Sequence, residues 1–222
     1  MREVVLDTET TGLDPAADHR IVEIGCVELI NHVPTERAFQ CYVNPERDMP
    51  EEAFNVHGLS TDFLTGHGVF ADIADEFLSF IEDSPLVIHN AEFDLKFLNA
   101  EFGRLGHPNI PRERAVDTVS LARRKFPGAQ ANLDALCRRF QIDLSDRSLH
   151  GALKDARLLA QVYLELIGGR QPDLALAKEA KKLQAAVKER PVRPPRRHGP
   201  SPDEEAAHAA FLAKLTEPVW RA

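Results

Sequence analysis

The order of β-type and helical segments constrains the fold of this chain most strongly. Residues 3–8, 21–30 and 37–43 are rich in β-branched residues and are separated by turn-formers, so they predict three successive strands. Helical patterns follow, and a short apolar run at 85–89 predicts a buried strand among them. This order favours an α/β fold, with a mixed sheet that is flanked by helices on both faces.

The helical patterns begin after the third strand. Short helices are expected within 51–65, and residues 69–81 carry apolar side chains at helical spacing. Further helices are predicted at 91–105, 120–125, 132–139 and 151–167.

The character of the chain changes after Gly168 and Gly169. Residues 171–190 are rich in Ala, Lys and Glu, and five prolines between 191 and 202 predict a semi-extended linker. An amphipathic pattern at 203–215 predicts a short C-terminal helix. We therefore expect a domain over 1–170, a short peptide at 171–176, a flexible basic linker over 177–202 and a tail over 203–222.

The net charge of −8 is unevenly distributed. Residues 178–202 hold eight Lys and Arg against two Glu, a charge of +6, and residues 203–222 carry −2. Residues 1–177 therefore carry −12. An acidic domain repels nucleic acid, so a nucleic-acid site here requires bound cations and a partner that supplies much of the affinity.

The composition describes a globular protein of 222 residues, 43% hydrophobic and 28% charged. No apolar run approaches the roughly 20 residues that cross a bilayer, so we expect no membrane association. No basic, small-residue leader pattern precedes Val4, so we expect no signal peptide. Three cysteines in apolar surroundings favour buried thiols in a reducing cytoplasm.

Two carboxylates lie at the end of the first predicted strand. Asp7 and Glu9 are spaced i, i+2, so both side chains point to one face. Two converging carboxylates must be solvated, hydrogen-bonded or bound to metal, and a solvated strand end is the alternative. The tight turn of residues 10–13 follows, and its N–H groups can approach a nucleotide.

Two further acids lie on the apolar faces of helices. Asp94 shares the inward stripe of 91–105, although an acid that favours the helix dipole is the alternative. Asp155 shares the apolar face of 151–167, and His150 lies five positions before it. A histidine can deprotonate water near neutral pH. The apolar residues that share a helix face with Asp94 are Phe97, Leu98, Phe102 and Leu105, and those that share a face with Asp155 are Leu158, Leu159, Val162 and Leu166.

These residues together resemble the DEDDh 3′→5′ exonucleases over residues 3–168. The H-x4-D spacing of His150 and Asp155 matches the histidine subclass of that family. Within it, the segments are similar to those of the proofreading epsilon subunits of bacterial DNA polymerase III. The similar segments are V-L-D-T-E-T-T-G, F-N-V-H-G-L, V-I-H-N-A-E-F-D, S-L-A-R-R-K-F-P-G, L-D-A-L-C-R-R-F and L-H-G-A-L-K-D-A.

The resemblance implies an RNase H-like fold and a site for two Mg²⁺ ions, with Mn²⁺ as a substitute. Asp7 would bridge both ions, Glu9 and Asp155 would complete one site, and Asp94 would support the other. His150 would take the proton of the attacking water. These roles imply metal-dependent hydrolysis of phosphodiester bonds.

The resemblance also implies contacts to a 3′-terminal nucleotide. The proposed metal ligands Asp7, Glu9 and Asp155 would also contact this nucleotide. The further residues implied are Thr10 and Gly12 at sugar or phosphate, Glu52 and His57 at the sugar, and Phe93 near the base. A structural role beside Phe54 is the alternative for His57. We leave Glu92 and His89 outside the catalytic set.

The C-terminal segments are expected to bind partners. Gln171, Leu174 and Leu176 resemble a bacterial sliding-clamp-binding peptide, with the start of an Ala-rich helix as the alternative. The tail with Phe211, Leu215 and Trp220 resembles the epsilon C-terminus, which implies docking onto the polymerase alpha subunit. A frayed tail is the alternative here.

The leading hypothesis is a cytoplasmic proofreading exonuclease at the replication fork, acting on DNA with a single-stranded or frayed 3′ end. One alternative is a free-standing exonuclease that acts on RNA or repair DNA. The other is a non-catalytic adaptor that binds clamp and polymerase.

Overall fold

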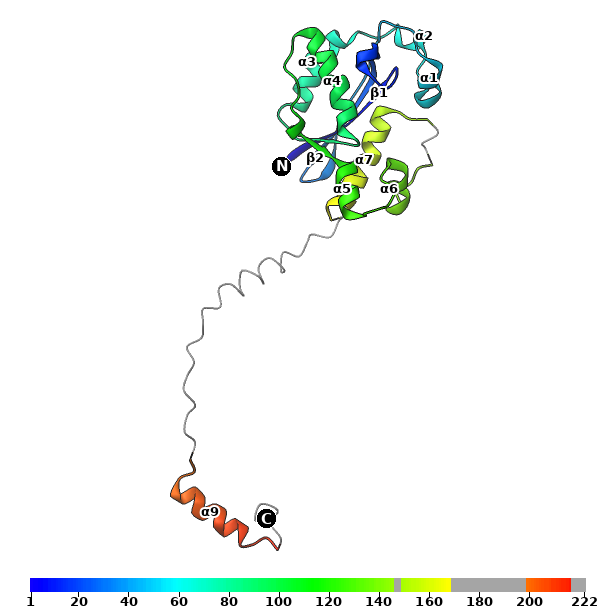
Figure 1. The fold of residues 1–222 in the computed structure, drawn as a ribbon. Helices are drawn as coiled ribbons and strands as arrows, with labels where there is room; N and C mark the ends of the chain where they lie inside the picture. The colour runs from blue at the N-terminus through cyan, green and yellow to red at the C-terminus, as the bar shows by residue number, and fades with distance from the viewer. Residues whose placement is uncertain (146–148, 169–198, 217–222) are drawn as a thin grey trace. The chain divides into compact units, whose positions relative to one another are not determined.

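The computed structural model describes residues 1–145, 149–168 and 199–216 (Figure 1). The chain divides into two units, residues 1–173 and 174–222, which are described separately. The predicted peptide at 171–176 and most of the predicted linker over 177–202 lie outside the described residues.

A five-stranded mixed sheet forms the centre of the first unit. The strands are β1 (Arg2–Thr10), β2 (Ile21–Ile30), β3 (Val33–Tyr42), β4 (Leu86–Ile88) and β5 (Ala115–Asp117), in the order β3-β2-β1-β4-β5. The pairs β1–β2 and β2–β3 are antiparallel, whereas β1–β4 and β4–β5 are parallel. The predicted mixed sheet is confirmed, but β5 was not predicted from the sequence.

Helices connect and cover these strands. Two short helices, α1 (Glu51–His57) and α2 (Thr61–Leu64), follow β3, and α3 (Phe70–Ile81) precedes β4. The later helices are α4 (Ala91–Leu105), α5 (Thr118–Lys125), α6 (Leu133–Arg139) and α7 (Ala152–Ile167). Two single-turn 3-10 helices, η1 (Pro15–Ala17) and η2 (Arg112–Arg114), lie in connections.

Each face of the sheet has its own apolar core. Val4 and Leu6 of β1 pack with α3 and α4 on one face, whereas Val5 packs with α5, α6 and α7 on the other. Helices on both faces are therefore confirmed. Leu105 is 39% exposed, so its predicted place in the apolar stripe of α4 is wrong, because the helix ends there at Gly106.

The first turn of α7 lies unusually close to β2. A Cβ atom on Gly25 would lie only 2.1 Å from the Leu153 nitrogen and 2.2 Å from the Ala152 carbonyl carbon. Only glycine permits this approach. Because Gly25 pairs with Asp7 across β1 and β2, the approach brings the start of α7 over the acidic end of β1.

The three cysteines are free thiols, with Cys26 and Cys137 buried and Cys41 half-buried. Burial raises the pKa of Cys137 to about 11, so this thiol stays protonated at neutral pH. None of the described helices combines the length and apolar character needed to cross a membrane.

The described part of the second unit contains α9 (Pro202–Leu212), which overlaps the predicted helical segment 203–215 but starts one residue earlier and ends three residues earlier. Its first turn is closed by a capping box, in which the Ser201 hydroxyl accepts from the Glu204 N–H and the Glu204 carboxylate accepts from the Ser201 N–H. No residue of α9 is buried.

Candidate active site

Three carboxylates from distant parts of the chain converge at one end of the sheet. Asp7 lies near the end of β1, and Asp94 and Asp155 lie in the first turns of α4 and α7. The parallel pairing of β1 with β4 brings the start of α4 beside Asp7, because α4 begins directly after β4. The close approach at Gly25 brings α7 to the same place.

The electrostatics of Asp7 reflect this convergence. Asp7 keeps part of its surface exposed, but withdrawal from bulk water raises its pKa well above the ordinary value. The negative charges of Asp94, Glu9, Asp155 and Glu23 raise its pKa further. A bound cation would relieve both effects, so this site fits divalent metal ions.

Asp94 is held by a residue that the sequence did not single out. The Thr8 hydroxyl donates a hydrogen bond of 2.7 Å to Asp94 Oδ1, and Asp94 is only 2% exposed. Burial raises the pKa of Asp94 to about 7, although the bond from Thr8 lowers it. Thr8 lies between Asp7 and Glu9 and points to the opposite side of the strand from them, so motif spacing alone gave no signal for this contact.

Glu9, His150 and Asp155 form a second constellation of possible metal ligands. One ligand atom from each lies within 4.8 Å of the others. His150 Nδ1 lies 2.9 Å from Asp155 Oδ2, and the imidazole is exposed whereas both carboxylates are buried. The structure therefore brings together all five residues that the sequence proposed for metal binding and base catalysis.

Glu23 supports the start of α7 and was also missed. It is 2% exposed, pairs across the sheet with Glu9, and its Oε2 accepts a 3.0 Å bond from the Ala152 N–H. Gln40 donates to its other oxygen at 2.8 Å. The N-cap residue of α7, Gly151, has no side chain, so Glu23 supplies an acceptor for the helix terminus.

The segment that carries His150 is attached to α1. The His150 N–H donates to the Val56 carbonyl at 3.1 Å. Leu149 packs over Gly58, where a Cβ would lie 2.7 Å from Leu149 Cδ1 and where φ is +73°. The position of the histidine is therefore coupled to the end of α1.

Two adjacent cavities open at this site. The first, which we call the carboxylate cavity, has a volume of about 420 Å³ and is lined by all four acidic candidates and His150. The second, which we call the apolar cavity, has a volume of about 550 Å³ and lies between the turn after β1 and α1. Thr8, Glu9 and Phe93 line both cavities, so the two lie side by side at the end of β1.

Most of the predicted nucleotide-binding residues line the apolar cavity, namely Glu9, Thr10, Gly12, Glu52, His57 and Phe93. Asp7 and Asp155 line only the carboxylate cavity. Glu52 is exposed in the apolar cavity, whereas His57 is buried and its Nδ1 accepts a hydrogen bond of 3.0 Å from the Leu59 N–H. Burial lowers the pKa of His57, so the ring is neutral at pH 7. Thr10 donates its hydroxyl proton to the Gly12 carbonyl at 2.6 Å.

The turn at Gly12 packs against the His19 side chain. A Cβ at this position would lie 2.3 Å from the His19 ring, which therefore packs directly on the turn. A side chain at position 12 would therefore displace the His19 ring, and the proposed contact of Gly12 with a nucleotide stays a prediction.

Glu92 and His89 were left outside the catalytic set. Glu92 is exposed, and His89 Nδ1 lies 2.9 Å from the Thr118 hydroxyl. His89 also lines the carboxylate cavity.

The predicted partner-binding residues are only partly described. Phe211 and Leu215 are 55% and 38% exposed, in and just after α9. Gln171, Leu174, Leu176 and Trp220 lie outside the described residues.

Comparison with known proteins identifies the family of this chain. A family model described as exonuclease matches residues 4–163. A DNA polymerase III subunit epsilon of Rickettsia felis is 58% identical over 174 residues, covering 77% of this chain and 76% of the relative. The Salmonella typhimurium protein of the same name is 43% identical over 238 residues, covering 100% and 98%.

Solved structures show the same fold. Exonuclease X in complex with 5′ overhanging duplex DNA is 26% identical, with a TM-score of 0.59, and covers 74% of this chain and 90% of that one. The nuclease domain of 3′hExo, a DEDDh family member bound to rAMP, is 20% identical, with a TM-score of 0.65, and covers 75% of this chain and 91% of that one. At this identity the similarity supports the fold alone. The chain therefore belongs to the exonuclease family and, within it, to the DNA polymerase III epsilon subunits, which are 3′→5′ proofreading exonucleases.

Proposed function

We propose that this chain removes mispaired 3′-terminal deoxynucleotides as a subunit of the replicative polymerase, and releases them as deoxynucleoside monophosphates. The observation that carries the proposal is the convergence of Asp7, Asp94 and Asp155 beside His150, at the junction of two cavities. A mispaired end unstacks more easily than a paired one, so it reaches such a site more often. Discrimination against errors can therefore arise outside the nuclease domain.

Members of this family depend on divalent metal ions, and the acidic site fits them. We propose two Mg²⁺ ions, with Mn²⁺ as a substitute, because both accept all-oxygen ligand sets. Asp7 would be shared, Glu9 and Asp155 would complete one position, and Asp94 would support the other. When bound, the ions would stabilise the attacking and leaving oxygens of the phosphodiester.

His150 is proposed as the general base. A bond from Nδ1–H to Asp155 Oδ2 fixes the tautomer in which Nε2 accepts a proton from water. Asp155 would then act twice, because one oxygen orients the imidazole and its carboxylate also faces the metal site.

The apolar cavity is proposed to hold the 3′-terminal nucleoside. Phe93 would contact the base, Glu52 and His57 the sugar, and Thr10 with the Gly12 backbone the sugar or phosphate. Because Phe93 and Glu9 line both cavities, a nucleoside in the apolar cavity would place its phosphate beside the carboxylates of the other cavity.

The experiment that tests this function is hydrolysis of a 5′-labelled DNA primer with a mismatched 3′ end, with Mg²⁺ and with EDTA. We expect stepwise shortening and release of deoxynucleoside monophosphates with Mg²⁺ only, and near-complete loss of turnover in Asp7→Ala. Retention of most activity by folded Asp7→Ala would refute the assignment. Faster hydrolysis of an RNA oligomer of the same sequence would favour a free-standing RNA exonuclease.

The tail is proposed to dock onto the polymerase alpha subunit. An isolated helix as short as α9 is marginal in water, so its exposed Phe211 and the nearby Leu215 and Trp220 are better explained as interface anchors. A chain truncated after Arg190 should fail to co-purify with polymerase, while keeping its nuclease activity. Co-purification at the level of the full chain would contradict this proposal.

Residues 171–176 are proposed to bind the sliding clamp, with Gln171, Leu174 and Leu176 placed in an apolar groove. The combined change Gln171→Ala and Leu174→Ala should weaken clamp binding measured by surface plasmon resonance. An unchanged affinity would refute it. The basic linker over 177–202 would then serve mainly as a tether that raises the local concentration of nuclease at the primer end.

A further inference from the structure

Few positively charged side chains line the two cavities that the DNA strand is proposed to occupy. The domain is strongly acidic, and the apolar cavity is lined by no lysine or arginine among the described residues. In the carboxylate cavity, the described lining includes one such residue, Arg138 of α6. Any phosphate that passes through this cavity without a metal ion beside it meets mostly acidic and amide side chains.

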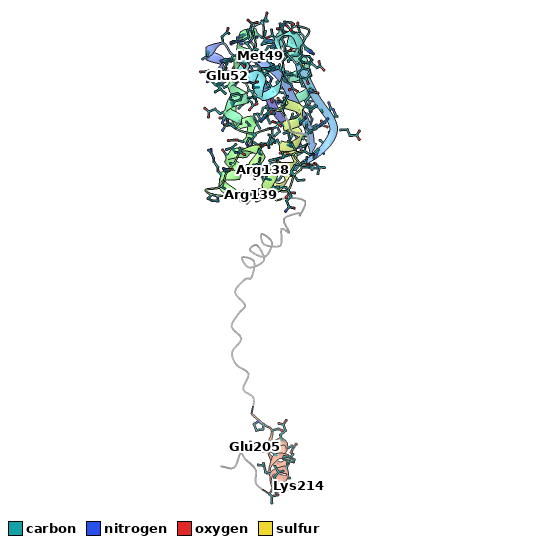
Figure 2. The ribbon with its side chains drawn as sticks, turned by 90° about the vertical axis from the view of Figure 1, so that its right-hand side faces the viewer. Met49, Glu52, Arg138, Arg139, Glu205 and Lys214 are labelled. Atoms are coloured by element: carbon teal, nitrogen blue, oxygen red, sulfur yellow. The ribbon has the colours of Figure 1, made fainter. Side chains whose placement is uncertain are left out.

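The proposed place of the terminal nucleoside determines the direction in which the strand leaves. If the terminal nucleoside occupies the apolar cavity beside α1, the next nucleotide must continue through the carboxylate cavity toward α6. Figure 2 shows Glu52 of α1 near one end of the domain and Arg138 near the other. Arg138 lines the carboxylate cavity but not the apolar cavity, so it lies away from the proposed place of the terminal nucleoside.

Arg138 is available for such a contact. It is exposed, and within the described residues its guanidinium makes no hydrogen bond or ion pair, although its carbonyl accepts from the Gln141 N–H. Its neighbour Arg139 is engaged differently, because its guanidinium lies 4.4 Å from the centroid of the Phe126 ring. Two adjacent arginines on one short helix thus have different surroundings, and Arg138 is the one that faces the cavity.

We propose that Arg138 binds a phosphodiester group of the DNA strand upstream of the scissile bond, and so forms a second subsite for the substrate. This inference rests on the proposed function, because it takes the strand direction from the terminal nucleoside in the apolar cavity. A guanidinium suits this role since its planar N–H groups match phosphate oxygens. The contact adds affinity for polynucleotide without touching the reacting atoms.

The test compares two substrates of the full-length protein. The first is a short oligothymidylate, and the second is the p-nitrophenyl ester of thymidine 5′-monophosphate, which has no upstream phosphate. Arg138→Ala should lower kcat/KM on the oligomer about fivefold, as expected for one exposed charge pair. It should also reduce the slope of log(kcat/KM) against log salt concentration by about 0.7. Hydrolysis of the ester should be unchanged.

Two controls sharpen the result. Arg138→Lys should keep most of the salt slope, and Arg139→Ala should leave kcat/KM on the oligomer at the wild-type level. Replacing the adjacent upstream phosphate by an uncharged methylphosphonate should slow the wild type but not slow Arg138→Ala further.

Equal losses on both substrates, or no loss on the oligomer, would overturn the subsite. A wild-type protein that hydrolyses neither substrate with Mg²⁺ or Mn²⁺ would instead overturn the proposed function on which the subsite depends. The two failures are therefore distinguishable from the wild-type rates alone.

Discussion

Substitution of Gly25 by alanine tests how tightly the site depends on the docking of α7. The added Cβ would lie 2.1 Å from the Leu153 nitrogen, whereas ordinary contact begins near 3.4 Å. The start of α7 must therefore move away by about 1.3 Å. Neither the added Cβ nor the Leu153 backbone nitrogen can relieve the contact by a side-chain rotation.

This displacement moves Asp155 and His150 relative to Asp7, which lies opposite Gly25 in the sheet. A misplacement of about 1 Å can lower the rate by roughly 10²-fold. Overpacking should at the same time destabilise the domain by about 1–3 kcal/mol. We expect a folded protein with kcat/KM about 10²-fold lower and with weaker Mn²⁺ binding.

The assay is hydrolysis of the p-nitrophenyl ester of thymidine 5′-monophosphate, with thermal unfolding and Mn²⁺ titration by calorimetry. Gly103→Ala is a matched control, because a Cβ at this exposed position of α4 meets no atom within 4 Å. This control should keep full activity and gain about 0.5–1 kcal/mol of stability. Activity of Gly25→Ala within about threefold of the wild type would refute the reasoning.

Three further predictions concern the acidic cluster. Thr8→Val removes the hydrogen bond to Asp94, so the affinity for Mn²⁺ measured by calorimetry should fall about tenfold. An unchanged affinity would show that Thr8 does not orient the Asp94 carboxylate. The pKa of Asp94 is raised to about 7 in the fold, so its ionisation opposes folding: the metal-free protein loses stability as pH rises from about 4 to about 7. In EDTA, the melting temperature of Asp94→Asn should therefore exceed that of the wild type by an amount that grows with pH over this range, and a constant difference would contradict the assigned pKa. Glu23→Ala leaves the Ala152 N–H without its acceptor, so kcat on the p-nitrophenyl ester of thymidine 5′-monophosphate should fall. Glu23→Gln keeps an acceptor oxygen and should retain a higher kcat than Glu23→Ala. Equal kcat values for the two variants would show that the hydrogen bond is dispensable.

Long periodic elements were predictable from the sequence, whereas short ones were not. The bounds of β2 and α4 agree with the predicted 21–30 and 91–105. The strand β5 has only three half-buried residues between η2 and α5, so no alternation or apolar run marks it. The strand β3 begins at Val33, before the predicted start at 37, because Pro34 and polar residues obscure an exposed edge strand.

The candidate site shows the same division. Acids on apolar faces, such as Asp94 and Asp155, are visible in sequence because a buried charge breaks the helical pattern. Thr8 and Glu23 were missed because their importance comes from partners 86 and 129 positions away along the chain. Gly25 was missed for a similar reason, since a glycine in a strand gives no indication of which backbone approaches it.

The dispersal of the carboxylates along the chain has a consequence for biosynthesis. Asp7 is made almost at the start of the domain, and Asp155 emerges only with its last helix, α7. Until α7 docks on β2, a nascent chain holds two of the three aspartates and no neighbouring imidazole from His150. On the proposed roles of Asp155 and His150, the enzyme becomes active only when translation and folding of the whole domain are complete, so unfinished chains should not degrade nearby DNA.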